Sequence, residues 1–248
     1  MKPFCRLLII YALIPVALAA CSSSSSSSSI PSQTALVRVR FAQGAPVLEA
    51  DVNGQPQELE NVYLQLDKAT VASSFSYGTI TTFSNVAPGA HTLTARDTLG
   101  YAVGPLKVPA LSAGMRYSLV LVGAYPNYSV LAFAEPGGSG AQLSLYEASP
   151  TVSQAAFGKF RASSGSGLVQ LGSAHYGAVS TVNLGKSVSD FGGYAGDAQA
   201  PYGKVTPAQI DSFDTHNVLP FQNATRLSLF LFDAPGSTTA QVFGSLDP

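Results

Sequence analysis

From Ala35 onward the chain consists of short apolar runs separated by turn residues. In the first run, Val37, Val39 and Phe41 alternate with Arg38 and Arg40, so the segment has one apolar and one polar face. A period of two residues is typical of a half-buried β-strand. No segment of the first half keeps the 3.6-residue period of a helix, and many short strands with Gly and Pro between them favour a sandwich or barrel. The sequence therefore predicts an all-β fold with antiparallel sheets.

Further elements follow from the same pattern. Asn53-Gly54 is the commonest signal for a two-residue hairpin. Leu227 to Phe232 is apolar on both faces, which indicates a central strand. Thr206 to Phe213 is expected to be a short helix, since Thr caps and Pro suits the first turn. Other strands are expected at 47–52, 61–66, 70–83 (broken at Tyr77-Gly78), 91–96, 101–108, 116–122 and 129–134.

The second half of the chain weakly repeats the first. Three segments align in the same order at similar offsets: 141–150 with 35–44 (offset 106), 176–181 with 77–82 (offset 99) and 226–231 with 116–121 (offset 110). A duplicated unit with a Gly-rich joint at 136–140 is one interpretation, and it predicts two β-sandwich domains at 35–136 and 141–248. One continuous sandwich of about 210 residues is the alternative.

The N-terminus has the anatomy of a secretory signal. Lys2 and Arg6 precede an apolar run from Leu7 to Leu18, which at about 12 residues is shorter than the ~20 needed to span a bilayer. The run ends in Leu18-Ala19-Ala20-Cys21, which resembles the lipobox of bacterial lipoproteins. The resemblance implies a signal peptide at 1–20, cleaved between Ala20 and Cys21. An ordinary signal peptide with unmodified Cys21 is the alternative.

The lipobox resemblance also implies a location. Cys21 would carry a diacylglyceryl group and an amide-linked acyl chain such as palmitate, which together anchor stably. Ser22 stands where the inner-membrane retention signal of the family has Asp, so the resemblance implies the outer membrane of a Gram-negative bacterium. Residues 21–34, with serines from Ser22 to Ser29, are expected to form a flexible linker that reaches roughly 20 Å.

Charge and cysteine content exclude some classes. Removal of Lys2 and Arg6 with the signal leaves 11 basic and 14 acidic residues, a net charge of −3. The basic residues, such as Arg38, Arg40, Lys107, Arg116, Lys159 and Arg161, are scattered along the chain. We therefore predict no nucleic-acid partner. Cys5 leaves with the signal, so the mature chain has no intramolecular disulfide and is held by burial alone.

A family resemblance supports the sandwich interpretation. The segments 37–46, 49–54, 75–78, 86–93 and 111–119 are similar in order and spacing to the domain of unknown function family 4397 (DUF4397). The resemblance covers 35–135 well and 141–248 poorly. It implies tandem immunoglobulin-like β-sandwiches in an exported protein and supplies no catalytic residues. The segment from about Pro56 to Ala72 departs from the family pattern and is expected to be an added hairpin or a protruding loop.

Sequence motifs for catalysis or metal binding are few. The chain has no nucleophile-elbow, zinc, phosphate-loop or calcium-loop motif. Ser164–Gly167 and Gly192–Gly196 are expected to be glycine-rich loops. Asp211, Asp214 and His216 form the one dense cluster of acids and histidine, with capping or solvated roles favoured over a metal or hydrolytic site. His91 and His175 have no carboxylate nearby in sequence and are expected to be structural.

Loop tyrosines offer a second functional hypothesis. Tyr125, Tyr128, Tyr194 and Tyr202 lie in Gly- and Pro-rich stretches, where exposed rings would stack on a sugar. The alternative is a structural role, in which these tyrosines pack loops over the edges of the sheets. The leading prediction is a non-enzymatic envelope lipoprotein that makes structural or protein contacts, without cofactor or metal. A carbohydrate-binding surface module is the alternative, and a hydrolase using Asp214 and His216 ranks third.

Overall fold

The computed structural model describes residues 35–138, 140–164, 167–185, 191–206, 209 and 226–247. By its internal contacts the chain divides into residues 1–33 and 34–248, and the second of these units is described below. Its described residues contain eighteen strands, so the prediction of an all-β fold is confirmed. No described helix is long and apolar enough to cross a bilayer.

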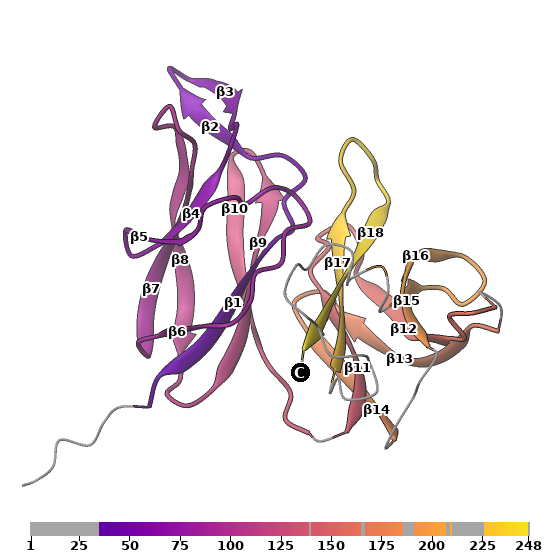
Figure 1. The fold of residues 1–248 in the computed structure, drawn as a ribbon. Helices are drawn as coiled ribbons and strands as arrows, with labels where there is room; N and C mark the ends of the chain where they lie inside the picture. The colour runs from indigo at the N-terminus through magenta and orange to yellow at the C-terminus, as the bar shows by residue number, and fades with distance from the viewer. Residues whose placement is uncertain are drawn as a thin grey trace, which may run out of the picture. The chain divides into compact units, whose positions relative to one another are not determined.

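The first half of this unit contains two four-stranded sheets and a hairpin (Figure 1). One sheet has the order β10-β9-β1-β6, with β1 (Val37–Gln43), β6 (Ser84–Val86), β9 (Arg116–Ala124) and β10 (Asn127–Ala134). The other has the order β5-β4-β7-β8, with β4 (Tyr63–Leu66), β5 (Ala69–Ala72), β7 (Gly89–Arg96) and β8 (Ala102–Leu111). The hairpin consists of β2 (Glu49–Val52) and β3 (Gln55–Glu58).

The second half repeats the two four-stranded sheets strand for strand, but its described residues contain no counterpart of the β2–β3 hairpin. One sheet has the order β14-β11-β17-β18, with β11 (Ala141–Glu147), β14 (Val179–Gly185), β17 (Arg226–Asp233) and β18 (Ala240–Asp247). The other has the order β13-β12-β15-β16, with β12 (Gln154–Phe160), β13 (Val169–His175), β15 (Gly192–Gly196) and β16 (Pro201–Val205). β11, β17 and β18 thus correspond to β1, β9 and β10.

Strand direction differs from the prediction in one respect. We predicted antiparallel sheets, but β1 pairs in parallel with β9, and β11 with β17. The strands of each parallel pair are joined by most of their half of the chain, so no short turn forces them to be antiparallel. All other strand pairs in the described part of the chain are antiparallel.

The strand register establishes the internal repeat. Arg38 pairs with Arg116 in the first half, and Gln142 pairs with Arg226 in the second. The partners are 78 residues apart in the first pair and 84 in the second, so the offset between β9 and β17 exceeds that between β1 and β11 by six residues. The predicted offsets of 110 and 106 differ by only four, and an offset of 110 requires 104 between β1 and β11, so the predicted 106 was two residues too large. A two-residue slip leaves every side chain on its own face, which explains why the alternating pattern did not exclude it.

Backbone hydrogen bonds confirm the third offset. The amide of Gly78 donates to the Gln43 carbonyl at 2.9 Å, and the amide of Gly177 donates to the Glu147 carbonyl at 2.8 Å. The offset of 99 between the two glycines is therefore correct. In each half the same turn lies beside the end of the first strand.

Each half has its own apolar core. Val39, Phe41 and Leu119 are buried between the sheets of the first half, and Leu143 and Leu229 between those of the second. All of β17 from Arg226 to Phe232 is buried, which confirms it as a central strand. Whether 35–136 and 141–248 are independent folding domains stays a prediction.

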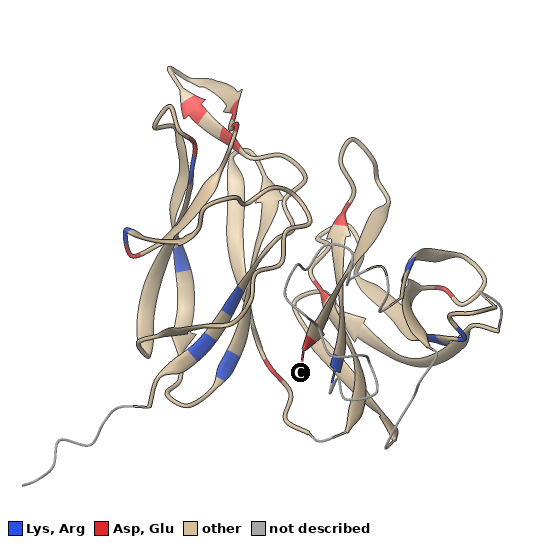
Figure 2. Cartoon of the chain, in the orientation of Figure 1, with Lys and Arg blue, Asp and Glu red and all other residues tan. Residues whose placement is uncertain are grey.

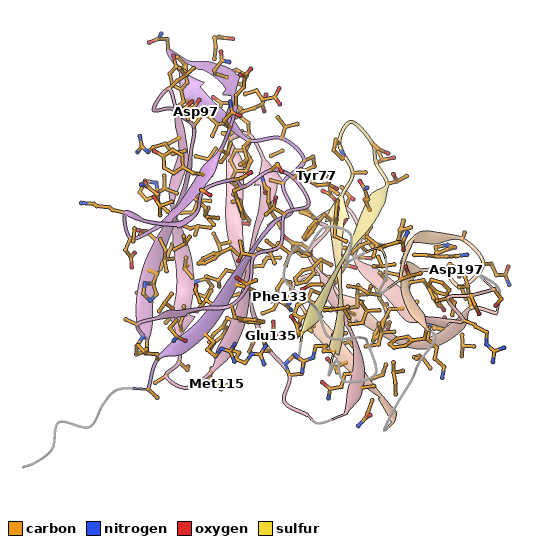
Figure 3. All side chains as sticks on the ribbon, viewed as in Figure 1. Tyr77, Asp97, Met115, Phe133, Glu135 and Asp197 are labelled. Carbon is orange, nitrogen blue, oxygen red and sulfur yellow. The ribbon has the colours of Figure 1, made fainter. Side chains whose placement is uncertain are left out.

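A third core lies between the outer faces of the two halves. It contains Ala42, Val120, Val122, Phe133, Tyr146, Ala148, Phe230 and Phe232. The rings of Tyr146 and Phe230 are stacked with centroids 4.4 Å apart, and Phe133 (Figure 3) meets the Tyr146 ring edge-on at 5.6 Å. Tyr77 also contacts the rings of the second half. The outer faces of β1 and β11 are thus covered rather than solvated.

The segment from Pro56 to Ala72 was assigned wrongly in part. The added element is the β2–β3 hairpin, which turns at Asn53 and Gly54 with φ angles of 57° and 81°. Both positive φ angles suit the predicted Asn-Gly turn. Residues 63–72 are instead β4 and β5 of the sandwich, and β4 pairs with β7.

Gly192–Gly196 is a strand and not the predicted loop. β15 is completely buried between β12 and β16. A Cβ at Gly193 would lie 2.8 Å from Leu143 and 2.9 Å from Leu229, so glycine allows a close approach there. Ser164 and Gly167 lie in the connection between β12 and β13, as predicted, while residues 165 and 166 are outside the described part.

Candidate functional site

Four arginines that are scattered in the sequence gather around one place in the structure. Arg38 and Arg40 lie on the outer face of β1, while Arg116 begins β9 and Arg226 begins β17. Figure 2 shows the basic positions of β1 and β9 close together. The prediction that Arg40 belongs to a half-buried strand's polar face was wrong about its surroundings, because Arg40 is 1% exposed. The second half of the chain covers that face.

Arg40 connects the two halves by hydrogen bonds. Its Nε donates to Ser118 Oγ at 2.6 Å within the first half. Its Nη1 donates to Asp247 Oδ1 at 2.6 Å and to Ser245 Oγ at 3.3 Å, and its Nη2 donates to Ser228 Oγ at 3.2 Å. Asp247 and Glu135, which lie beside it, raise the pKa of Arg40 against the opposing effect of burial. Arg40 is therefore charged and is held by groups of both halves.

Glu135, which follows β10 (Figure 3), balances two of these arginines. Its Oε1 lies 3.2 Å from Arg40 Nη2 and accepts from Ser118 Oγ at 2.5 Å. Its Oε2 accepts from Arg226 Nη1 at 2.7 Å and from the Tyr146 hydroxyl at 2.5 Å. Burial would raise the pKa of Glu135, but Arg40 and the other donors outweigh it, so the pKa lies below its usual value.

Arg226 continues the network toward the connection between the halves. Its Nη2 donates to Gln142 Oε1 at 2.8 Å, and its Nε reaches the same oxygen at 3.2 Å. Nη2 also donates to the carbonyl of Pro136. Buried charges are stable only when paired and hydrogen-bonded, and Arg40, Glu135 and Arg226 meet both conditions.

A cleft of about 420 Å³ opens beside this network. Its wall is made by residues 114–116 at the start of β9, residues 135–138 of the connection, Gln142, Arg226 and Asp247. This volume lies within the range of small-molecule sites. The cleft combines an apolar side chain, Met115, with charged and amide groups.

Arg116 is the arginine of this wall whose charge is least compensated. Its guanidinium lies over the ring of Phe83 at 4.2 Å, and its Nε is buried without a hydrogen-bond partner among the described residues. Burial lowers the pKa of Arg116, Asp247 and Glu135 raise it, and Arg38 and Arg226 lower it, with a net lowering. The arrangement can hold a negative group chemically, because a guanidinium presents a fixed fork of donors.

The tyrosines predicted as a sugar platform are not brought together. Tyr194 is fully buried in β15, so its expected exposure was wrong, and Tyr202 in β16 is 41% exposed. Tyr125 and Tyr128 lie at the β9–β10 turn and are half-buried. The Tyr128 hydroxyl accepts from the Glu49 amide at 2.9 Å and donates to the Val47 carbonyl at 3.1 Å, while the Tyr125 hydroxyl donates to Asp51 at 3.2 Å. These two tyrosines hold the β2–β3 hairpin.

His91 has a carboxylate partner that its sequence neighbourhood did not reveal. Its Nδ1 lies 2.5 Å from Asp67 Oδ2, and its Nε2 lies 2.8 Å from the Ala87 carbonyl oxygen. Burial would raise the pKa of Asp67, but hydrogen bonds from Thr92 and His91 give a net lowering. The pairing of β4 with β7 brings the two together across 24 residues. The structural role predicted for His91 fits this position, and His175 is exposed at the end of β13.

Glu147 is a buried acid that the sequence analysis did not single out. Its Oε1 accepts from the Ser149 amide at 3.0 Å, and its Oε2 is buried without a hydrogen-bond partner in the described part. Burial, with nearby Asp233, raises the pKa of Glu147 to about 8. With β1 and β11 aligned at an offset of 104, Glu147 corresponds to Gln43 of the first half. This alignment of an acid with a buried amide is the sequence signal that could have identified Glu147.

Several predicted positions lie outside the described residues. These are Ala20 and Cys21, the cluster of Asp211, Asp214 and His216, and most of the helix expected at 206–213. At its start, Thr206 and Gln209 exchange hydrogen bonds in the manner of a capping box. Among the described residues, no group of three or more His, Cys, Asp or Glu could hold a metal ion.

Comparisons with known proteins give little similarity. No protein-family model matches the chain, and no curated protein matches it. Among solved structures, one similar chain is that of CBMbc (family CBM26) from Eubacterium rectale Amy13K in complex with maltoheptaose. It is 12% identical, covers 85% of this chain and 97% of its own length, and has a TM-score of 0.21. A TM-score this low indicates neither a shared fold nor a shared ligand.

Proposed function

We propose that this chain is a lipid-anchored protein of the bacterial cell envelope, with lipid on Cys21 and a serine linker, whose paired β-sandwiches make non-enzymatic contacts with envelope components. The signal-like N-terminus and the lipobox resemblance at Leu18–Cys21 support the anchor. The resemblance to the domain of unknown function family 4397 supports an exported module.

One geometric observation carries the proposal. β1 begins at Val37, directly after the linker, and it lies between β6 and β9 in its sheet. The same strand carries Arg40, whose hydrogen bonds reach Ser228 and Asp247 in the second half. The residues that follow the linker are thus hydrogen-bonded to both halves, as suits a module held at a membrane by its N-terminal end.

The anchor is tested by substitution of Cys21. We expect Cys21→Ala to abolish incorporation of labelled palmitate and to release the protein from the membrane fraction. Mass spectrometry of the mature N-terminus should show acylated Cys21 in the natural chain. A natural chain with unmodified Cys21 overturns the proposal.

Substitution of Ser22 tests which of the two membranes holds the protein. The lipoprotein resemblance implies that Asp at this position retains a lipoprotein in the inner membrane. We therefore expect the natural chain in the outer-membrane band of a density gradient and Ser22→Asp in the inner-membrane band, with equal palmitate incorporation. Sedimentation of both in the inner-membrane band contradicts the outer-membrane assignment.

The interaction role is tested in intact cells. We expect chemical cross-linking followed by affinity purification to recover the same envelope partner in repeated experiments, and to lose it with Cys21→Ala because the protein is displaced. Recovery of no reproducible partner counts against a contact-making role.

A glycan-binding surface is a second candidate, favoured by the partly exposed rings of Tyr125 and Tyr202. A glycan array separates the two. If Tyr125 stacks on a sugar, Tyr125→Ala loses binding while Tyr125→Phe, which keeps the ring and loses only the hydrogen bond to Asp51, retains it. Flat binding curves for the natural chain remove this candidate.

A further inference from the structure

The cleft beside Arg116 has a surplus of positive charge. Arg40 forms ion pairs with Glu135 and Asp247, and Arg226 forms one with Glu135. Two acids therefore balance two arginines, and Arg116 has no ion pair or hydrogen bond from its guanidinium to another described residue. The exposed Arg38, its register partner on β1, adds a further positive charge nearby.

The position of Arg116 suits a ligand in the cleft. The Phe83 ring covers one face of the guanidinium at 4.2 Å, so the side chain is held while its edge is left for hydrogen bonds. Arg116 as a whole residue is only half-buried, and it is part of the cleft wall. Charge, a fixed orientation and open space therefore occur together at this arginine.

A second donor lies on the same wall. Gln142 Oε1 accepts a hydrogen bond from Arg226 Nη2. The Nε2 donor group at the other corner of the same amide therefore points away from Arg226. Gln142 Nε2 lies against Gly138, where a Cβ would come within 1.9 Å of it. The absence of a side chain at Gly138 thus gives the amide its place in the wall.

We propose that this cleft binds a carboxylate group, with Arg116 as the principal contact and Gln142 as a second donor. Guanidinium and carboxylate match as a two-pronged pair. Glu135 and Asp247 are paired with Arg40 and Arg226, so Arg116 is left as a single uncompensated charge, which the single charge of a carboxylate balances without the excess that a doubly charged phosphate would bring beside the two acids. The site goes beyond the proposed envelope role and does not depend on lipid at Cys21.

Calorimetric titration of the detergent-solubilised mature chain at neutral pH tests the site. The carboxylates of an acidic sugar and of a peptide C-terminus share this chemistry, so two probe pairs distinguish them. One pair is D-glucuronate with D-glucose, and the other is acetyl-dialanine with its C-terminal amide. We expect at least one carboxylate to bind about tenfold or more tightly than its neutral counterpart, and the pair that responds identifies the source.

Arginine variants locate the binding. We expect Arg116→Gln to weaken carboxylate binding by about tenfold or more and Arg116→Lys to weaken it less, since Lys keeps the charge and loses the fork. Arg38→Gln is the matched control, because it removes the same charge from a neighbour that is not part of the cleft wall. It should change the affinity by less than about threefold, since an exposed charge at longer range is screened. Unchanged circular dichroism confirms that the variants fold.

Four outcomes overturn the proposal. The first is that no binding of either carboxylate is detected, and the second is that the neutral probes bind as tightly as the carboxylates. The third is that inorganic phosphate binds more tightly than both carboxylates, and the fourth is that Arg116→Gln and Arg38→Gln lose the same amount of affinity. None of them affects the test of the lipid anchor, which is read from Cys21 alone. A failure of this site and a failure of the proposed function are therefore distinguishable.

Discussion

Gln43 and Glu147 occupy the same position at the ends of equivalent strands. Each side chain accepts a hydrogen bond at 3.0 Å from the backbone amide two residues later, at Ala45 and at Ser149. An amide is neutral at every pH, whereas the buried carboxyl of Glu147 has its pKa raised to about 8. The second half therefore contains a titratable group where the first half has none.

We predict that Glu147→Gln stabilises the protein at neutral pH. The folded pKa of about 8 lies above the usual value of 4.5, so the contribution of Glu147 is fully present below about pH 4.5 and is lost as the pH rises to about 8. Each pH unit between 4.5 and 7 removes about 1.4 kcal/mol of the free energy of unfolding, so the carboxyl of Glu147 costs about 3 kcal/mol at pH 7. Urea denaturation at several pH values should show a higher midpoint for the variant at pH 7 and little difference at pH 4.

The reverse substitution is the matched control. Gln43→Glu places the same carboxyl in the first half, where Gln43 is 2% exposed. We expect it to lower the denaturation midpoint at pH 7 and to have less effect at pH 4. If neither Glu147→Gln nor Gln43→Glu changes the pH dependence, burial of this position does not control its ionisation.

Among the strands, alternation predicted the elements well and their surroundings poorly. The period of two in Val37, Val39 and Phe41 correctly assigned one face of β1 to the core. It could not show that another sheet covers the face of Arg40, because alternation records which face a residue is on and not what lies against it. The cleft and its arginines therefore could not be predicted, since residues 40, 116 and 135 come together only through the strand pairing of the first half, and they meet Arg226 only when the two halves pack together.

Glycine content misled the prediction for β15. Glycines are typical of loops, but a completely buried strand also uses them where neighbouring side chains leave no room for a Cβ. Composition alone does not separate these cases. The contacts of Gly193 with Leu143 and Leu229 do separate them, and they lead to a test.

We predict that Gly193→Ala destabilises the protein by about 1–3 kcal/mol. The added methyl group would lie within 3 Å of two core leucines, and overpacking of this kind forces neighbours to shift. Gly137→Ala is the control, because nothing lies within 4 Å of its Cβ position, and it should change stability by less than about 0.5 kcal/mol. Thermal denaturation measures both, and equal melting temperatures would contradict the packing described for β15.

At the scale of the whole unit, the contact between the halves has two parts. One end of the outer faces is apolar and includes Val120 and Phe230, while the other end is polar and includes Arg40, Glu135 and Asp247. The apolar part contributes burial, whereas buried ion pairs contribute little net stability and destabilise strongly when one partner is removed.

We predict that Arg40→Met destabilises the protein by about 3–5 kcal/mol, because Glu135 and Asp247 lose their shared partner in a buried position. The third core and the Arg226–Glu135 ion pair still join the halves, so we expect one transition at a lower urea concentration. Denaturation followed by circular dichroism measures the shift of the midpoint.

Two further variants control this prediction. Arg38→Met removes an exposed arginine from the same strand and should change stability by less than about 0.5 kcal/mol. Arg40→Met combined with Asp247→Asn removes the acid whose ion pair with Arg40 is lost, while Glu135 keeps its ion pair with Arg226, and this variant should recover most of the lost stability. If the combined variant is no better than Arg40→Met, lost packing rather than unpaired charge explains the effect.

The third core joins unequal members of equivalent pairs. Ala42, Val120 and Val122 on the first half correspond to Tyr146, Phe230 and Phe232 on the second, so small side chains meet rings. Two first halves placed together in this way would leave holes, and two second halves would collide. If neighbouring molecules exchanged halves, the first half of one molecule would therefore have to pack on the second half of another. The sizes of these side chains alone exclude contacts between two first halves or between two second halves.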